Sequence, residues 1–142
     1  MSFTERFTER WQLLDTIPPS SSSAEQNTGW ISMANFQRVV FILQTGAIED
    51  TGTVDLDIEV GTTSAGGTTA TLKSITQLTT ADDNKVVVVE VRGEEMNVAG
   101  VEYDYIQGEL TGANAAGITA LQVWGYCEYA PAVTTLIDEI VD

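Results

Sequence analysis

The sequence predicts a mainly β protein, an antiparallel β-sandwich or a jelly-roll-like barrel. Three observations favour this class: short runs rich in β-branched and aromatic residues, turn signals between them at sandwich-like spacing, and no alternation of strands with long helical patterns. With 142 residues, 43% of them hydrophobic, the chain suits one domain with one core. We divide it into a helical or extended N-terminal arm with its linker at residues 1–28, a β-sandwich body at 29–131 and a C-terminal tail at 132–142, for which a short helix is expected.

Six or seven strands are expected in the body. Residues 53–60 alternate between apolar and acidic side chains, so one face points to the core and the other to solvent. Residues 85–92 are apolar on both faces, as in a central strand. Residues 118–129 put Leu121, Val123 and Cys127 on one face and Trp124 and Tyr126 on the other. A long, mobile loop of glycine, threonine and serine is expected at residues 61–69, and further strands at residues 38–44, 70–75 and 103–110.

The N-terminal arm carries an aromatic stripe. A four-residue repeat places Phe3, Phe7 and Trp11 on one face of a helix, with Leu14 continuing it. The helix must end before Pro18-Pro19, and the serines that follow form a polar tether. A short helix cannot bury such a face by itself, so it must dock on its own domain, a sister subunit or another protein, and the tether favours an intermolecular contact. The expected arm interface is Phe3, Phe7, Trp11, Leu14 and Ile17.

A second apolar set lies in the C-terminal tail. Pro131 can open a short helix that runs through Ile140, because proline is well tolerated at the first helical position. The apolar face of that helix, and therefore the expected tail interface, is Leu136, Ile137 and Ile140.

The charge balance excludes several classes of partner. The chain has 21 acidic and 6 basic residues, a net charge of -15, and no lysine or arginine after Arg92. Such a surface repels phosphate backbones and anionic lipid, so we expect no nucleic-acid and no membrane partner. Three roles of the acidic surface remain: keeping the protein soluble, binding a cation, or contacting a basic partner. Solubility combined with charge complementarity to a partner is favoured.

Catalysis has little support in the sequence. The chain contains no histidine, which removes the commonest general base and excludes Ser–His and Cys–His nucleophiles. Asp104 and Glu109 are carboxylates without a recognisable glycosidase motif. Cys127 lies in an apolar run, which favours a small buried apolar side chain over a reactive thiol. We therefore expect no enzymatic activity, no catalytic residues and no cofactor.

Calcium is the more serious chemical alternative, because oxygen ligands need no histidine. Asp55, Asp57 and Glu59 share one strand face, but neighbours on that face lie about 6.6 Å apart, too far for a tight site without a loop. The turn at residues 82–84 offers better geometry without matching an EF-hand loop. A solvated face and a solvated turn are favoured in both places, so no metal site is expected.

Four stretches of the body resemble a known family: residues 29–46, 70–80, 81–96 and 126–131. Together they resemble a family of small tailed-phage virion proteins that are encoded near the major capsid protein and act as head decoration, or cement, proteins. The resemblance covers about residues 29–131 and rests on the residue patterns of the strands and of the turns between them. It implies a structural protein of the virion's capsid surface. The implied partners are the phage major capsid protein and other copies of the chain, as a homotrimer or another homo-oligomer.

Two other functions remain open at this point. The first is a carbohydrate- or receptor-binding sandwich at a particle surface, with Tyr103, Trp124 and Tyr126 as a stacking platform. The second is a head–tail or tail-tube component assembled in rings. Residues 1–14 lack the apolar core of a signal peptide, and the longest apolar runs are far shorter than a membrane span, so we expect synthesis in the host cytoplasm.

Overall fold

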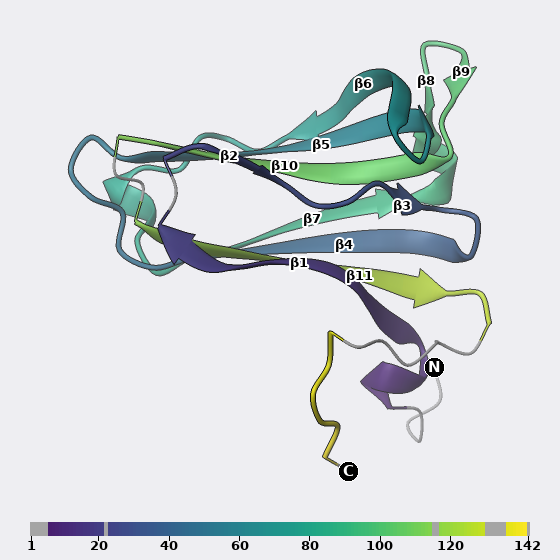
Figure 1. The fold of residues 1–142 in the computed structure, drawn as a ribbon, viewed down its shortest axis with the longest axis horizontal. Helices are drawn as coiled ribbons and strands as arrows, with labels where there is room; N and C mark the ends of the chain where they lie inside the picture. Colours follow the sequence, from purple (N-terminus) through teal and green to yellow (C-terminus); the bar gives the residue numbers. More distant parts are fainter. Residues whose placement is uncertain (1–5, 22, 115–116, 130–135, 142) are drawn as a thin grey trace.

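The computed structural model describes residues 6–21, 23–114, 117–129 and 136–141, which form two antiparallel sheets packed face to face (Figure 1). The prediction of a mainly β protein with antiparallel sheets is confirmed, and the two layers form a sandwich. Sheet A has the order β1 (Trp11–Ser21), β11 (Ile118–Cys127), β4 (Phe36–Thr45) and β7 (Val86–Arg92). Sheet B has the order β2 (Glu25–Asn27), β10 (Tyr105–Ala113), β5 (Thr53–Thr63) and β6 (Gly66–Ser74), with β3 (Ile31–Ser32) also paired to β10.

The remaining elements are short. The hairpin of β8 (Asn97–Val98) and β9 (Val101–Glu102) projects at one end of the sandwich (Figure 1). Three 3-10 helices complete the described part of the chain: η1 (Phe7–Glu9), η2 (Thr80–Asp82) and η3 (Gly93–Met96).

The core lies between the two sheets and is built largely by alternation. Every second side chain is buried from Val39 to Thr45 of β4 and from Val54 to Val60 of β5, and Phe41 of β4 has 0% of its surface exposed. Gly108 of β10 lies directly over Phe41, because a Cβ atom there would be only 3.0 Å from the ring. The inward faces predicted for residues 53–60 and 118–129 are confirmed, although the last strand ends at Cys127. The largest fully buried side chains are Phe41, Leu43, Leu56, Ile58, Ile106, Leu110 and Leu121.

The predicted N-terminal helix is wrong. Residues 11–21 form β1, the edge strand of sheet A, paired along its length with β11. Two register shifts interrupt this pairing, one between Leu13 and Asp15 and one between Ile17 and Ser20. The second shift contains Pro18-Pro19, which an edge strand tolerates because no further strand needs their missing N–H groups. The two prolines therefore lie within a bulged strand, and the serines that follow extend it to Ser21.

Two further predictions about the body are wrong in detail. Residues 61–69 are no long loop: β5 continues to Thr63 and β6 starts at Gly66, so a tight turn joins them. Gly66 and Gly67 make that turn possible with φ of 90° and 63°, a region that favours glycine. Residues 86–92 form an edge strand rather than a central one, and its apolar outer face is solvent-exposed.

The expected C-terminal helix is not supported. Its beginning at Pro131 falls outside the described residues, and residues 136–141 contain no helix. Leu136 and Ile140 are 46% and 49% exposed. They offer separate apolar side chains, without the continuous helical face that the sequence predicted.

Candidate interaction surface

Four aromatic rings gather on the outer side of sheet A. Trp11 of β1 lies opposite Tyr126 of β11, and Trp124 lies two residues before Tyr126 on the same face. Phe7 joins them from η1, which lies against the outer side of this sheet (Figure 1). Phe7 stacks on Trp11 with ring centroids 5.8 Å apart and meets Trp124 edge-on at 5.0 Å. The Trp11 and Tyr126 rings contact edge-to-face at 5.4 Å.

This group continues as an apolar surface across the rest of sheet A. Val40 of β4 lies opposite Trp124, and Ile42 lies between Gln122 and Val88 of β7 in the strand register. Val88 is 60% exposed and Val86 55% exposed, although outward positions of a sheet edge are usually polar. We call this surface the aromatic face; its members are Phe7, Trp11, Val40, Ile42, Val86, Val88, Trp124 and Tyr126.

Polar side chains interrupt the aromatic face: Arg38, Gln44, Glu90 and Gln122 also point outward from β4, β7 and β11, and the first, third and fourth make specific contacts. The Arg38 guanidinium lies 5.7 Å from the centre of the Tyr126 ring, a cation–π distance, and its Nη1 is 3.2 Å from a carboxylate oxygen of Glu90. The indole N–H of Trp124 donates to the side chain of Gln122 at 3.0 Å. The rings are thereby held in defined orientations, which reduces the ordering cost of binding a partner.

The residues predicted for the arm interface divide between the core and this face. Ile17 is 4% exposed and belongs to the main core, and Leu14 packs against that core from the inner side of β1. Phe7, at 54% exposed, and the partly buried Trp11 lie on the aromatic face, whereas Phe3 lies outside the described residues. Docking on the chain's own domain thus accounts for Leu14 and Ile17, whereas Phe7 and Trp11 remain available for contact with another molecule.

One member of the predicted stacking platform is misplaced. Tyr103 is 7% exposed and packs in the core, so it does not join Trp124 and Tyr126 on the outer side. Cross-strand pairing supplies Trp11 instead. Sequence spacing could not show this partner, because Trp11 and Tyr126 lie 115 positions apart and only the sheet register brings them together.

The outer side of sheet B has the opposite character. Asp55, Asp57 and Glu59 point outward from β5, and Glu109 of β10 lies directly opposite Asp57. Burial raises the pKa of the Glu109 carboxyl, and the neighbouring carboxylates of Glu25, Glu59 and Asp57 raise it further. We call this the acidic face; its members are Glu25, Asp55, Asp57, Glu59 and Glu109. Across the described segments of the chain, no three acidic or cysteine side chains converge as a metal site would require.

Crowding on the acidic face leads to a stability prediction. Glu109→Gln should raise the melting temperature at pH 7 by about 2 °C, because it removes one of several repelling carboxylates. A raised folded-state pKa means that the folded protein holds this proton more tightly than the unfolded chain, so the charge destabilises only above the unfolded pKa. The gain should therefore shrink as the pH falls through the folded-state pKa of Glu109. Thermal unfolding of both proteins from pH 3.5 to 8 tests this, and an equal gain at every pH would contradict it.

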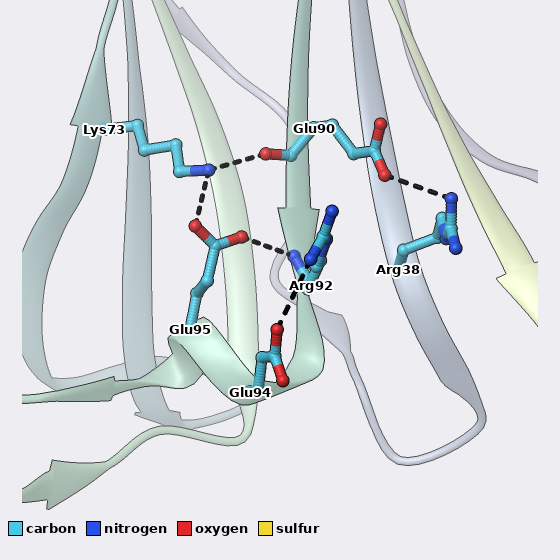
Figure 2. A network of polar contacts seen from close by, with 6 residues as sticks. All are labelled: Arg38, Lys73, Glu90, Arg92, Glu94 and Glu95. Atoms are coloured by element: carbon cyan, nitrogen blue, oxygen red, sulfur yellow. Dashed lines mark hydrogen bonds and ion pairs between the residues drawn. The ribbon is translucent and has the colours of Figure 1, made fainter.

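A network of ion pairs closes one side of the sandwich (Figure 2). Lys73 of β6 reaches across to the other sheet, where its Nζ lies 2.8 Å from Glu95 of η3 and donates to the main-chain oxygen of Glu90 of β7 at 2.7 Å. The other carboxylate oxygen of Glu95 accepts from the N–H of Arg92 at 2.8 Å. The hydrogen bonds from Lys73 and from that N–H lower the pKa of Glu95. A surface pocket is lined by Lys73, Glu90, Arg92, Glu94 and Glu95. Together with Arg38, which pairs with Glu90, the network balances three basic and three acidic side chains. The contacts of Lys73 join the two sheets.

The single cysteine contributes to packing. Cys127 is 4% exposed, and burial raises the pKa of its thiol, which keeps it in the unreactive protonated form.

Comparison with known proteins adds one distant likeness. No protein-family model matches the chain, and no curated protein matches it. Among solved structures, the chain is similar to a chain of the infectious bursal disease virus VP2 subviral particle, with a TM-score of 0.39 and 16% identity. The match covers 83% of this chain and 33% of that chain, so this chain spans about a third of the VP2 length. A likeness at this level identifies neither family nor function.

The arrangement is suited to binding. None of the described helices is long and apolar enough to cross a membrane. The two outer surfaces of the sandwich differ sharply in chemistry, one aromatic and apolar, the other acidic. Such a difference is typical of a protein that presents one side to a partner and the other to water.

Proposed function

We propose that the chain is a structural virion protein that decorates a tailed-phage head. It binds the major capsid shell through the aromatic face and presents the acidic face to solvent. The observation that carries the proposal is the chemical difference between the two outer sides of one sandwich. A monomeric antiparallel sandwich buries its inner faces and keeps both outer faces polar, and sheet A departs from that pattern.

The aromatic face has the composition of a binding surface. Tryptophan and tyrosine are enriched where proteins meet, because they bury a large rigid area at a low entropic cost. Covering roughly 300 Å² of apolar surface contributes on the order of 7 kcal/mol before ordering costs. A single face of this kind can therefore hold the chain on a larger assembly.

The acidic face supports the same orientation. Many copies on one shell, each at -15, would stand close together with like charges facing water. At physiological salt the repulsion between them is screened beyond about 8 Å, so it costs little while keeping the particle soluble. The proposal includes no catalytic step, cofactor or metal, and it places the protein on the capsid surface.

A second candidate is carbohydrate or receptor binding. The specific observation in its favour is the ordered set of Trp11, Trp124 and Tyr126 rings, since sugars stack on aromatic faces. A ring-forming connector is the third. The number of copies on a purified particle separates decoration from a connector, because decoration requires hundreds of copies and a connector only a small ring number.

The salt dependence of binding tests the apolar nature of the contact. Binding to purified heads should be nearly flat, or slightly stronger, as salt rises from about 0.05 to 0.5 M, because apolar contacts strengthen and charge contacts are screened. Co-sedimentation with heads at several salt concentrations measures it. A steep loss over that range would mean that the acidic face, meeting a basic capsid patch, holds the protein in place.

A further inference from the structure

The free edge of β7 has unused hydrogen-bonding groups. β7 ends sheet A, with β4 on one side only. The main-chain oxygen of Lys85, just before β7, accepts from the N–H of Thr45 of β4. Because the N–H and C=O groups of alternate residues in a strand point to the same side, the odd-numbered residues of β7 direct these groups toward β4. The main-chain oxygen of Glu90 accepts from Lys73, and the N–H of Arg92 donates to Glu95. The main-chain groups of the even-numbered residues therefore point to the free edge. Within the described chain, no strand pairs with the edge groups of Val86 and Val88.

Lys73 and Glu95 cover one half of this edge. They occupy the oxygen of Glu90 and the N–H of Arg92 (Figure 2). Charged groups set across an edge in this manner block strand addition there. The open half is Val86 and Val88, whose side chains are also the most exposed of the strand's valines.

We propose that the open half of the β7 edge pairs with the same segment of a second copy of the chain. The two strands run antiparallel about a twofold axis at Val87, with Val86 of one copy opposite Val88 of the other. Each of these two pairs exchanges two hydrogen bonds. A register shifted by one pair toward Glu90 would need its main-chain oxygen, which Lys73 already holds. A shift in the opposite direction would need the N–H of Asn84, which already donates to the oxygen of Gly46, so both neighbouring registers are disfavoured.

Two features favour a second copy over a different protein. The segment is self-complementary: exposed valines lie opposite exposed valines on the outer side, as an isologous contact requires. The local charge also permits it, because Arg38, Lys73, Lys85 and Arg92, four of the six basic residues, lie at or beside this edge. The three described ion pairs, to Glu90, Glu94 and Glu95, neutralise the region. A copy with charge -15 meets less repulsion here than at the acidic face.

The pairing would join two copies of sheet A into one sheet. Since opposite residues of paired strands point to the same side, the two aromatic faces would lie side by side. This inference goes beyond the proposed function and stands without it, because it concerns how copies meet and not what the aromatic face binds.

Val88→Pro tests the pairing. The N–H of Val88 faces the open edge, so proline there removes no bond to β4 and should leave a folded monomer. Sedimentation equilibrium of the full chain from about 1 to 500 μM should show a dimer for the natural sequence and at least a 100-fold weaker association for Val88→Pro. Val88→Thr, which keeps the N–H and the branched shape, is the matched control and should still dimerise. A natural chain that stays monomeric throughout, or an undiminished Val88→Pro dimer, overturns the proposal.

Amide hydrogen exchange keeps the test valid if the proline variant does not fold. In the natural chain, the amides of Val86 and Val88 should exchange at least tenfold more slowly at 500 μM than at 5 μM. Equal exchange at both concentrations overturns the proposal. The Trp124→Ser variant separates the β7 pairing from the proposed function. It should lose head binding and keep the dimer, because the substitution changes the aromatic face and leaves the β7 edge intact.

Discussion

Removing residues 1–19 is expected to unfold the protein, whereas removing residues 1–9 should leave it folded. The longer deletion takes most of β1 out of sheet A and, with it, the buried side chains of Leu13 and Ile17. Burying two such side chains contributes about 3–6 kcal/mol, and the exposed edge of β11 adds a further cost. The sum is comparable with the whole stability of a domain of this size.

Circular dichroism separates the two deletions. The 1–9 deletion should keep the natural far-ultraviolet spectrum and melt within a few degrees of the full chain, although it loses Phe7 from the aromatic face. The 1–19 deletion should show no cooperative transition. A 1–19 deletion that melts like the full chain would show that β1 is dispensable and that the N-terminal segment acts only between molecules.

The second large effect concerns binding. The double variant Phe7→Ser, Trp124→Ser should bind heads at least 100-fold more weakly than the natural protein, because it removes two contacting rings from the centre of the aromatic face. Its folding should change little, since both side chains lie on the outer side of sheet A. The matched control, Asp57→Asn with Glu109→Gln on the acidic face, should bind as the natural protein does. Equal losses in both variants would mean that the surface used is not the aromatic face.

Much of the sandwich could be predicted from the sequence because its inner strands alternate without interruption. The strand at residues 53–60 shows the period of two directly, and the pattern of residues 118–129 predicts the correct faces for Leu121, Val123 and Cys127. β1 could not be found in this way. Its two register shifts bring the adjacent Leu13 and Leu14 both under cover, and the four-residue spacing of the aromatic residues before it imitates a helix.

The candidate surface was predicted only in part, for a different reason. The sequence patterns indicate all four rings, but in two unrelated groups, Phe7 with Trp11 and Trp124 with Tyr126, because sequence distance does not show which strands are neighbours. Residues 86–92 show the same limit: an edge strand with an apolar outer face has the pattern of a central strand. The edge strand is mistaken for a central strand because the outward side chains of β7, Val86 and Val88, are apolar although they are exposed to solvent.

Hydroxyl-radical footprinting of the free protein and of the head-bound protein tests the central claim most directly. Tryptophan and tyrosine are both oxidised readily, and the two outer sides of the sandwich carry separate probes. Trp11, Trp124 and Tyr126 report on the aromatic face, and Tyr105 reports on the outer side of sheet B, where it pairs with Gly61. We predict strong protection of the first three on the particle and unchanged labelling of Tyr105. Protection of Tyr105 with unchanged labelling of Trp11, Trp124 and Tyr126 would contradict the account.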